Sequence, residues 1–95
     1  MEFVWDPAKS EANLQARGFD FAFASLIFSG PILEVEDTRR DYGERRLVAI
    51  GLADGFHLTV VYTDRRAKEG LVRRIISARR SNRRERQAYD AALGA

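Results

Sequence analysis

Polar side chains recur every four positions near the start of the chain, at Lys9, Asn13 and Arg17. This spacing places all three on one face of a helix. Asp6 can cap the helix, a proline suits its first position, and Gly18 can adopt the left-handed conformation that ends it. The sequence therefore predicts a helix over residues 7 to 17. Its polar face is either solvated or a clamp for phosphate.

The next apolar segment, FAFASLIF, follows Asp20 and ends at a Ser-Gly-Pro stop over residues 29 to 31. Asp20 can cap a second short helix here. The apolar residues surround the helix axis instead of forming a stripe, which is typical of a buried helix. We expect this helix to pack in the core.

From Ile32 the pattern changes to the alternation of β-strands. The predicted strands are ILEVEDTR (32 to 39), ERRLVAIGL (44 to 52), FHLTVVYT (56 to 63) and LVRRIISAR (71 to 79). The predicted turns between them, at residues 41 to 43, 53 to 55 and 67 to 70, are too short for parallel crossovers. The sequence therefore predicts a four-stranded antiparallel meander.

A last helix should begin at Asn82, because Glu85 stands three residues later in a capping-box spacing. Apolar residues then fall on one side of this helix, at Ala88, Tyr89, Ala92 and Leu93. Helices at both ends and strands in the middle predict an α+β fold, in which two N-terminal helices and a C-terminal helix accompany the sheet.

Composition is consistent with one domain over residues 1 to 95, with 45% hydrophobic and 32% charged residues. No apolar run approaches the roughly 20 residues that span a bilayer, and no secretory signal is visible. We therefore expect a cytoplasmic protein without membrane contact. The absence of cysteine excludes disulfides, cysteine-based zinc sites and a thiol nucleophile, and one histidine excludes a histidine-rich metal site. We expect neither metal nor cofactor.

Positive charge is concentrated at the C-terminal end. Residues 1 to 70 carry 9 Lys and Arg against 12 Asp and Glu, whereas residues 71 to 95 carry 7 arginines against 2 acids. Arginine is suited to bidentate phosphate recognition and to stacking on bases. This distribution indicates a polyanionic partner.

Both faces of the last predicted strand carry arginine. Strict alternation places Arg73, Ile75, Ser77 and Arg79 on one face and Arg74, Ile76, Ala78 and Arg80 on the other. An arginine on the helix-covered face would need a cleft or an acidic partner, and Glu34, Glu36 and Glu44 are available. Alternatively, these arginines only protect a sheet edge from aggregation.

Metal-free RNA cleavage requires a base for the 2′-OH, an acid for the leaving 5′-oxygen and fixed cations around the phosphate. Arg, Lys, Glu and Tyr side chains can fill all three roles. His57 is a further candidate, but its position beside a turn favours an exposed histidine without a catalytic role.

Several motifs together resemble the BrnT family, the toxin subunit of a bacterial type II toxin–antitoxin pair. They are W-D-P-x-K-x-x-x-N from Trp5, F-x-x-A from Phe21, Y-G-E-R-R from Tyr42, V-Y-T from Val61 and R-I-I-S-A-R-R-x-x-R-R-E-R-x-x-Y from Arg74. The resemblance implies a RelE-like microbial ribonuclease fold, RNA cleavage that inhibits translation, and neutralisation by a BrnA-like antitoxin. Such an antitoxin has a ribbon-helix-helix domain, through which alone operator DNA would be bound.

The resemblance also suggests site residues. Lys9, Glu44, Tyr62, Arg74 and Arg79 are the candidate catalytic residues, with Lys9 or Glu44 as the base and Arg74 and Arg79 on the scissile phosphate. Asn13, Arg17, Arg46, Arg80 and Arg83 are the candidate RNA-binding residues. Family members commonly have histidine where this chain has Arg17, and arginine cannot exchange protons near neutral pH.

Two other functions are compatible with the same residues. The chain could be a non-catalytic nucleic-acid-binding or antitoxin-complex subunit, a degenerate toxin whose arginines contact phosphate without cleaving it. It could also be an interaction protein whose arginines dock an acidic segment of a partner.

Overall fold

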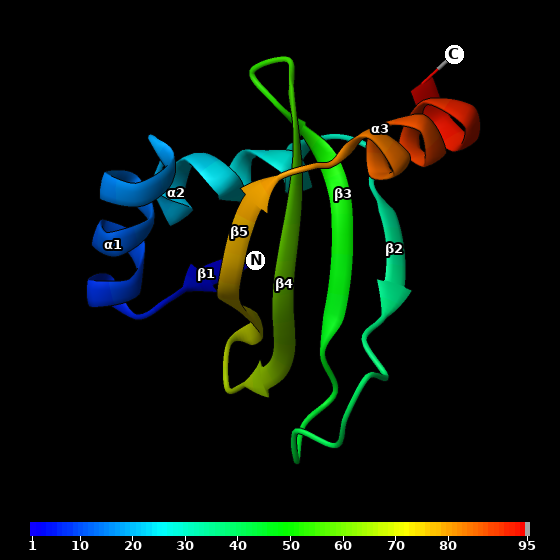
Figure 1. The fold of residues 1–95 in the computed structure, drawn as a ribbon. Helices are drawn as coiled ribbons and strands as arrows, with labels where there is room; N and C mark the ends of the chain where they lie inside the picture. Colours follow the sequence, from blue (N-terminus) through cyan, green and yellow to red (C-terminus); the bar gives the residue numbers. More distant parts are fainter. Residues whose placement is uncertain (95) are drawn as a thin grey trace.

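The computed structural model of the protein describes residues 1–94 and confirms the α+β fold (Figure 1). The elements are, in chain order, β1 (Glu2–Val4), α1 (Pro7–Arg17), α2 (Phe21–Ala24), the 3₁₀-helix η1 (Ser25–Ser29), β2 (Leu33–Glu36), β3 (Leu47–Ala53), β4 (Phe56–Ala67), β5 (Gly70–Arg80), α3 (Arg83–Tyr89) and a final π-helical turn η2 (Asp90–Gly94). No helix in this described part is long and apolar enough to cross a membrane.

The sheet has the strand order β1-β5-β4-β3-β2. The four predicted strands, β2 to β5, pair with their neighbours in chain order and antiparallel. The prediction of a purely antiparallel sheet of four strands is nevertheless wrong. The N-terminal segment adds β1 parallel to β5, with Phe3 opposite Arg73, and makes a mixed sheet of five strands. A strand of three residues is too short to show an alternating pattern.

Local capping signals define the helices as expected. Asp6 accepts a hydrogen bond from the Ala8 amide at the start of α1, and Gly18 ends the helix with φ of 85°. Asn82 and Glu85 form both hydrogen bonds of the capping box at α3. The second predicted helix differs, because its α-helical turn α2 tightens into the 3₁₀-helix η1 after Ala24.

The core lies between the helices α1, α2 and η1 and one face of the sheet, which we call the helix face. This face is formed by Leu58, Val60 and Tyr62 of β4 and their cross-strand neighbours, and in Figure 1 α2 and η1 run behind the strands. η1 lies directly against β3 at Gly51, where a Cβ atom would stand 2.8 Å from the Cβ of Ile27. Glycine is therefore required at this contact.

A β-bulge in β5 shifts the register between Val61 and Tyr62, and Ile76 is left without an opposing residue. Side chains beyond the bulge therefore change face relative to strict alternation. Ala78 joins Ile75 in the buried core, while Ser77 is exposed. The predicted grouping of Ser77 and Arg79 with Arg73 is wrong for this reason.

The connection between β2 and β3 is longer than the predicted turn. β2 ends at Glu36 and β3 begins at Leu47, so residues 37 to 46 form a loop. Asp37 organises it: its carboxylate accepts hydrogen bonds from the Arg39 side chain at 2.9 Å and from the Tyr42 hydroxyl at 3.3 Å. These local bonds compete with strand pairing, which explains why the strands stop short of the predicted ends.

Candidate functional site

The face of the sheet opposite the helix face carries two exposed arginines of β5, Arg74 and Arg79. We call it the open face. In register along it lie Val48, Val61 and Ser77, which are partly or fully exposed. α3 covers one end of this face, where the Tyr89 ring packs edge-on against His57, and the loop of residues 37 to 46 lies at the other end. The middle of the open face is therefore framed on two sides.

Arg79 lies at the α3 end of the open face, opposite Thr59 of β4. It donates two hydrogen bonds to Glu85, at 2.7 Å and 2.8 Å between the paired nitrogens and oxygens. The hydrogen bonds from Arg79 lower the pKa of Glu85, and the same pair raises the pKa of Arg79. The guanidinium is thus held in a fixed orientation, yet about half of the side chain remains exposed.

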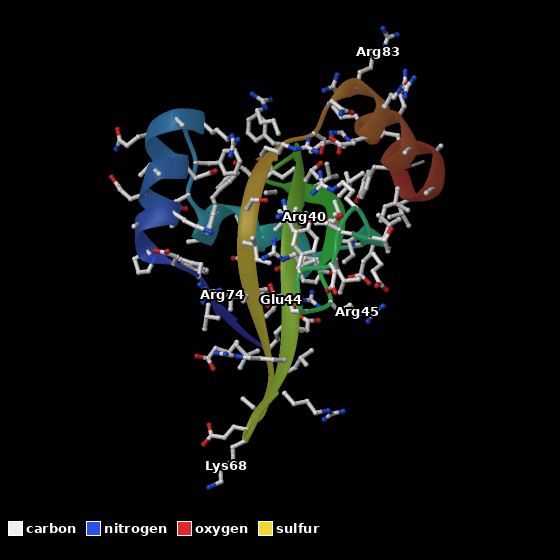
Figure 2. The ribbon with its side chains drawn as sticks, turned by 60° about the horizontal axis from the view of Figure 1, so that its bottom comes forward. Arg40, Glu44, Arg45, Lys68, Arg74 and Arg83 are labelled. Atoms are coloured by element: carbon white, nitrogen blue, oxygen red, sulfur yellow. The ribbon has the colours of Figure 1, made fainter. Side chains whose placement is uncertain are left out.

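Arg74 and Arg46 lie toward the other end. Arg74 is exposed on β5 opposite Thr63, whose hydroxyl donates to the carbonyl of Arg45 at the end of the loop. The guanidinium of Arg46 stands 4.0 Å from the centre of the Tyr42 ring and bonds Glu44 at 3.1 Å. Figure 2 labels Glu44 of this loop and Arg74 of β5, which is separated from β3 by β4.

The loop adds an arginine that the sequence did not single out. Arg39 is bound to Asp37, yet its charge acts on Arg79 and opposes the rise in the pKa of Arg79. We define the basic face as this part of the open face with Arg46, Arg74 and Arg79, beside the loop that carries Arg39.

The predicted residues of α1 lie beside this face, at the outer edge of β5. Lys9, Arg17, Ile76 and Ser77 help to line a groove of about 400 Å³ between α1 and β5. Asn13 is buried and donates to the carbonyl of Phe19, while Arg17 bonds the Asn13 oxygen and the carbonyl of Ala78. Asn13 and Arg17 therefore fix α1 to its surroundings. Lys9 and Arg17 are both exposed cations of this groove, and Ser77 connects it to the open face.

Tyr62 is a correction to the predicted catalytic set. Its side chain is fully buried in the core, its ring packs edge-on against Phe28 with centroids 5.0 Å apart, and its hydroxyl has no hydrogen-bond partner among the described residues. A group enclosed in this way cannot contact RNA in this conformation. We exclude Tyr62 from the candidate site.

Two further predicted RNA-binding residues lie away from the basic face. Arg80 is on the helix face, 5.1 Å from the centre of the Phe56 ring. Arg83 is exposed at the start of α3 and points away from the sheet, at the end opposite Arg74 (Figure 2). The structure thus brings Arg46, Arg74 and Arg79 to one face with Glu44 on the adjoining loop, and separates Arg80 and Arg83 from them.

The acidic partners of the arginines also differ from the prediction. Glu36 pairs with Arg45 and Glu44 with Arg46, both at 3.1 Å. The β5 arginines pair with other acids: Arg73 with Asp64 and Arg79 with Glu85. The hairpin register and the α3 capping box create these contacts. His57, expected to be exposed, is largely covered and bonds Asp90 at 2.9 Å.

No group of three or more His, Asp or Glu side chains positioned to hold a metal ion is found within residues 1–94. The accessible chemistry of the basic face therefore consists of guanidinium groups, the Glu44 carboxylate and, at the edge of β5, the Lys9 ammonium. Guanidinium groups hold phosphate oxygens by paired hydrogen bonds, and a carboxylate or amine can transfer a proton.

Comparison with known proteins agrees with this chemistry. Residues 5–85 match the family described as ribonuclease toxin, BrnT, of type II toxin–antitoxin system. No curated protein matches the chain. The family match begins just after β1 and covers both N-terminal helices, the strands β2 to β5 and the start of α3. The chain therefore belongs to the BrnT family of ribonuclease toxins of type II toxin–antitoxin systems.

Proposed function

We propose that this chain is a metal-independent endoribonuclease that cleaves RNA on the basic face and so inhibits translation. One observation carries the proposal: Arg74 and Arg79 of β5 are exposed on the same face of the sheet, and the adjoining loop carries Arg46 and Glu44. RNA presents a phosphate at every nucleotide, and closely spaced guanidinium groups stabilise the extra negative charge of its transition state.

In the proposed reaction the 2′-oxygen attacks the adjacent phosphorus and the bond to the 5′-oxygen breaks. Arg74 and Arg79 bind the non-bridging oxygens of the phosphate. Lys9 and Glu44 are the candidates for the base that takes the 2′-OH proton, and the leaving oxygen is protonated by the other group or by water. With its side chain buried, Tyr62 takes no part in this step.

Metal independence is supported by the side chains themselves. The sequence has no cysteine and a single histidine, and His57 is engaged with Asp90 and Tyr89 under η2 and α3. Metal-dependent nucleases hold their ions with clusters of carboxylates or histidines. The fixed charge of Arg74 and Arg79 can supply the stabilisation that a metal ion supplies elsewhere.

We also propose a BrnA-like antitoxin as the partner. Membership in a type II toxin family implies an antitoxin, and a ribbon-helix-helix domain in it would bring operator DNA to the complex. Binding of an acidic part of the antitoxin over the basic face would block access of RNA. The toxin itself would contact DNA only through this partner.

The deciding experiment is cleavage of a labelled single-stranded RNA by the purified chain in excess EDTA. We expect discrete cut products, and growth arrest when the chain is expressed alone. A requirement for Mg²⁺ would refute metal independence. Binding without cleavage would favour the non-catalytic alternative.

That alternative has one observation in its favour, since Arg17, at the position where related chains commonly have histidine, is bound to Asn13 and Ala78 and cannot exchange protons. A non-catalytic subunit would bind RNA with a steep dependence on salt but would leave it intact. Restoring histidine as Arg17→His would then create cleavage that the parent chain lacks.

A further inference from the structure

A second recess lies on the helix face, at the end of the sheet away from the loop of residues 37 to 46. It has a volume of about 360 Å³ and is bounded by the end of α1, the start of α2 and the hairpin between β3 and β4. Its walls are mainly apolar, with Leu14, Phe19, Phe23, Phe56 and Leu58. We call it the aromatic pocket.

The walls of the aromatic pocket are unusually open for such apolar side chains. Leu14 is 38% exposed and Phe56 is 46% exposed. The Phe19 and Phe23 rings, 5.9 Å apart, are held by the turn in which Asp20 caps α2. Because the aromatic walls are anchored to the core, the pocket exists before any ligand binds. Preformed apolar pockets of this kind receive the anchor side chains of partner proteins.

The charged groups at the aromatic pocket are mostly positive. Arg17 is held in place by Asn13 and by the carbonyl of Ala78, and Arg80 lies against the Phe56 ring. The one acid among its lining residues, Asp20, already accepts a hydrogen bond from the Phe23 amide. A ligand that places an apolar group in the pocket and carboxylates beside it would therefore be complementary in charge.

The pocket is separate from the basic face. Arg79 and Arg80 are adjacent in β5, but they point to opposite faces of the sheet, Arg79 toward α3 and Arg80 toward Phe56. Nothing in the proposed cleavage step uses Leu14 or Phe56. A ligand in the aromatic pocket would consequently leave the phosphate-binding arginines unchanged.

We propose that the aromatic pocket receives an apolar side chain of leucine or phenylalanine size from an acidic segment of the antitoxin. This inference rests on the proposed function, since it identifies one contact of the proposed partner. It separates recognition of the antitoxin from catalysis: part of the binding energy comes from a surface that RNA does not need.

A protein anchor fits the pocket better than an RNA base. The floor is the buried side chain of Leu58, and the walls are mainly phenylalanine and leucine side chains. The polar lining residues already have partners: Arg17 bonds Asn13 and the Ala78 carbonyl, and Asp20 caps α2. Bases are recognised where stacking is combined with polar groups that can bond their edges. An aliphatic or aromatic side chain needs no such partner.

The test measures the affinity of the free chain for an immobilised BrnA-like antitoxin, with RNA cleavage assayed in parallel. Phe56→Ala and Leu14→Glu should weaken antitoxin binding at least tenfold and leave RNA cleavage within twofold of the parent. Leu26→Glu is the matched control, because Leu26 is also 46% exposed but lies on η1 outside the pocket, and it should change neither quantity. Circular dichroism melting verifies that each variant is folded.

If Leu14→Glu is not folded, Arg80→Glu provides a second measurement. It should weaken antitoxin binding in a manner that high salt reduces, because it removes a positive charge beside the pocket. Equal affinities for the pocket variants and the Leu26 control would overturn the proposal, as would a parent chain that does not bind this antitoxin. Loss of RNA binding with unchanged antitoxin affinity would assign the pocket to RNA instead. A parent chain that binds antitoxin but cuts no RNA would refute the proposed nuclease and leave this comparison intact.

Discussion

Arg73 and Arg79 lie six positions apart in the same strand, but the β-bulge between them places them in opposite surroundings. On the helix face, Arg73 is about 13% exposed, donates two hydrogen bonds to Asp64 and lies between the Phe28 and Tyr62 rings at 4.6 Å and 4.3 Å. On the open face, Arg79 is about half exposed and is held from one side only, by Glu85.

The difference shows that the same residue type can be enclosed by its partners at one site and remain accessible at another. The guanidinium of Arg73 donates hydrogen bonds to Asp64 and packs against the Phe28 and Tyr62 rings. Little of the group is therefore available to a ligand. Arg79 is oriented but accessible, and Arg74, farther along the same face, makes no ion pair with any residue in the described chain. A guanidinium that binds phosphate must be held in a fixed orientation and still be open to the ligand.

The largest expected effect concerns the open face. Arg79→Ala should reduce RNA cleavage by about 10²-fold, the loss typical of one donor at an electrostatic site, with little change in melting temperature. Arg79→Lys should not restore the rate, because an ammonium cannot provide two parallel donors. Single-turnover cleavage of a labelled RNA measures both.

Glu85→Gln and Arg83→Ala are the controls for this prediction. Glu85→Gln breaks the same ion pair but keeps Arg79, so it should retain most of the cleavage. Arg83→Ala should weaken RNA binding slightly and in a salt-dependent way, since Arg83 points away from the basic face. If Glu85→Gln loses as much activity as Arg79→Ala, then Arg79 acts only by holding α3.

The helix face should respond in stability instead. Arg73→Ala leaves the carboxylate of Asp64 without its partner and removes the packing between two rings, which should cost about 2 kcal/mol of unfolding free energy. Urea denaturation is the measurement, and Arg74→Ala should lie within about 0.5 kcal/mol of the parent. Equal stability of the two variants would mean that the contrast between the two faces is not energetic.

Tyr62→Phe sharpens the correction to the catalytic set. Removing a buried hydroxyl that has no hydrogen-bond partner should leave stability unchanged or raise it by up to about 1 kcal/mol. Cleavage should stay at the parent rate, because the ring remains in the core. A loss of cleavage without a loss of stability would return Tyr62 to the catalytic site and require the core to open during the reaction.

The smallest expected effect is a dependence on acid in the loop beside the basic face. Hydrogen bonds from Arg39 lower the pKa of Asp37 from 3.8 to about 2. The stabilisation by this carboxylate is therefore fully present above about pH 4 and is lost as the pH falls toward 2. Asp37→Asn and Arg39→Gln should both flatten the decline of unfolding free energy between pH 4 and 2. If the unfolding free energies of both variants decline with pH as steeply as that of the parent, then the Asp37–Arg39 pair does not contribute to the acid dependence.

Secondary structure was predictable wherever the signal is local. Asp6 and Gly18 bound α1 at the predicted residues, and Asn82 and Glu85 form the predicted capping box. Each of these caps joins groups only a few residues apart, so the local sequence is enough to predict it. The candidate site was predictable in part for a similar reason, because Arg74, Arg79 and Arg46 belong to motifs whose order resembles the family.

The sequence by itself therefore determined the helix ends, four of the strands and their antiparallel order, and the concentration of arginine on the last strand. Tertiary structure alone decided which arginines share a face of the sheet. The bulge at Ile76 changes the face on which the side chains beyond it lie. Pairing of β5 with β4 places Arg73 opposite Asp64, and the position of α3 brings Glu85 to Arg79. It also buried Tyr62 and added β1. These outcomes depend on contacts between residues far apart in the chain, and the free energy of such contacts is fixed only when the whole sheet and its helices pack together.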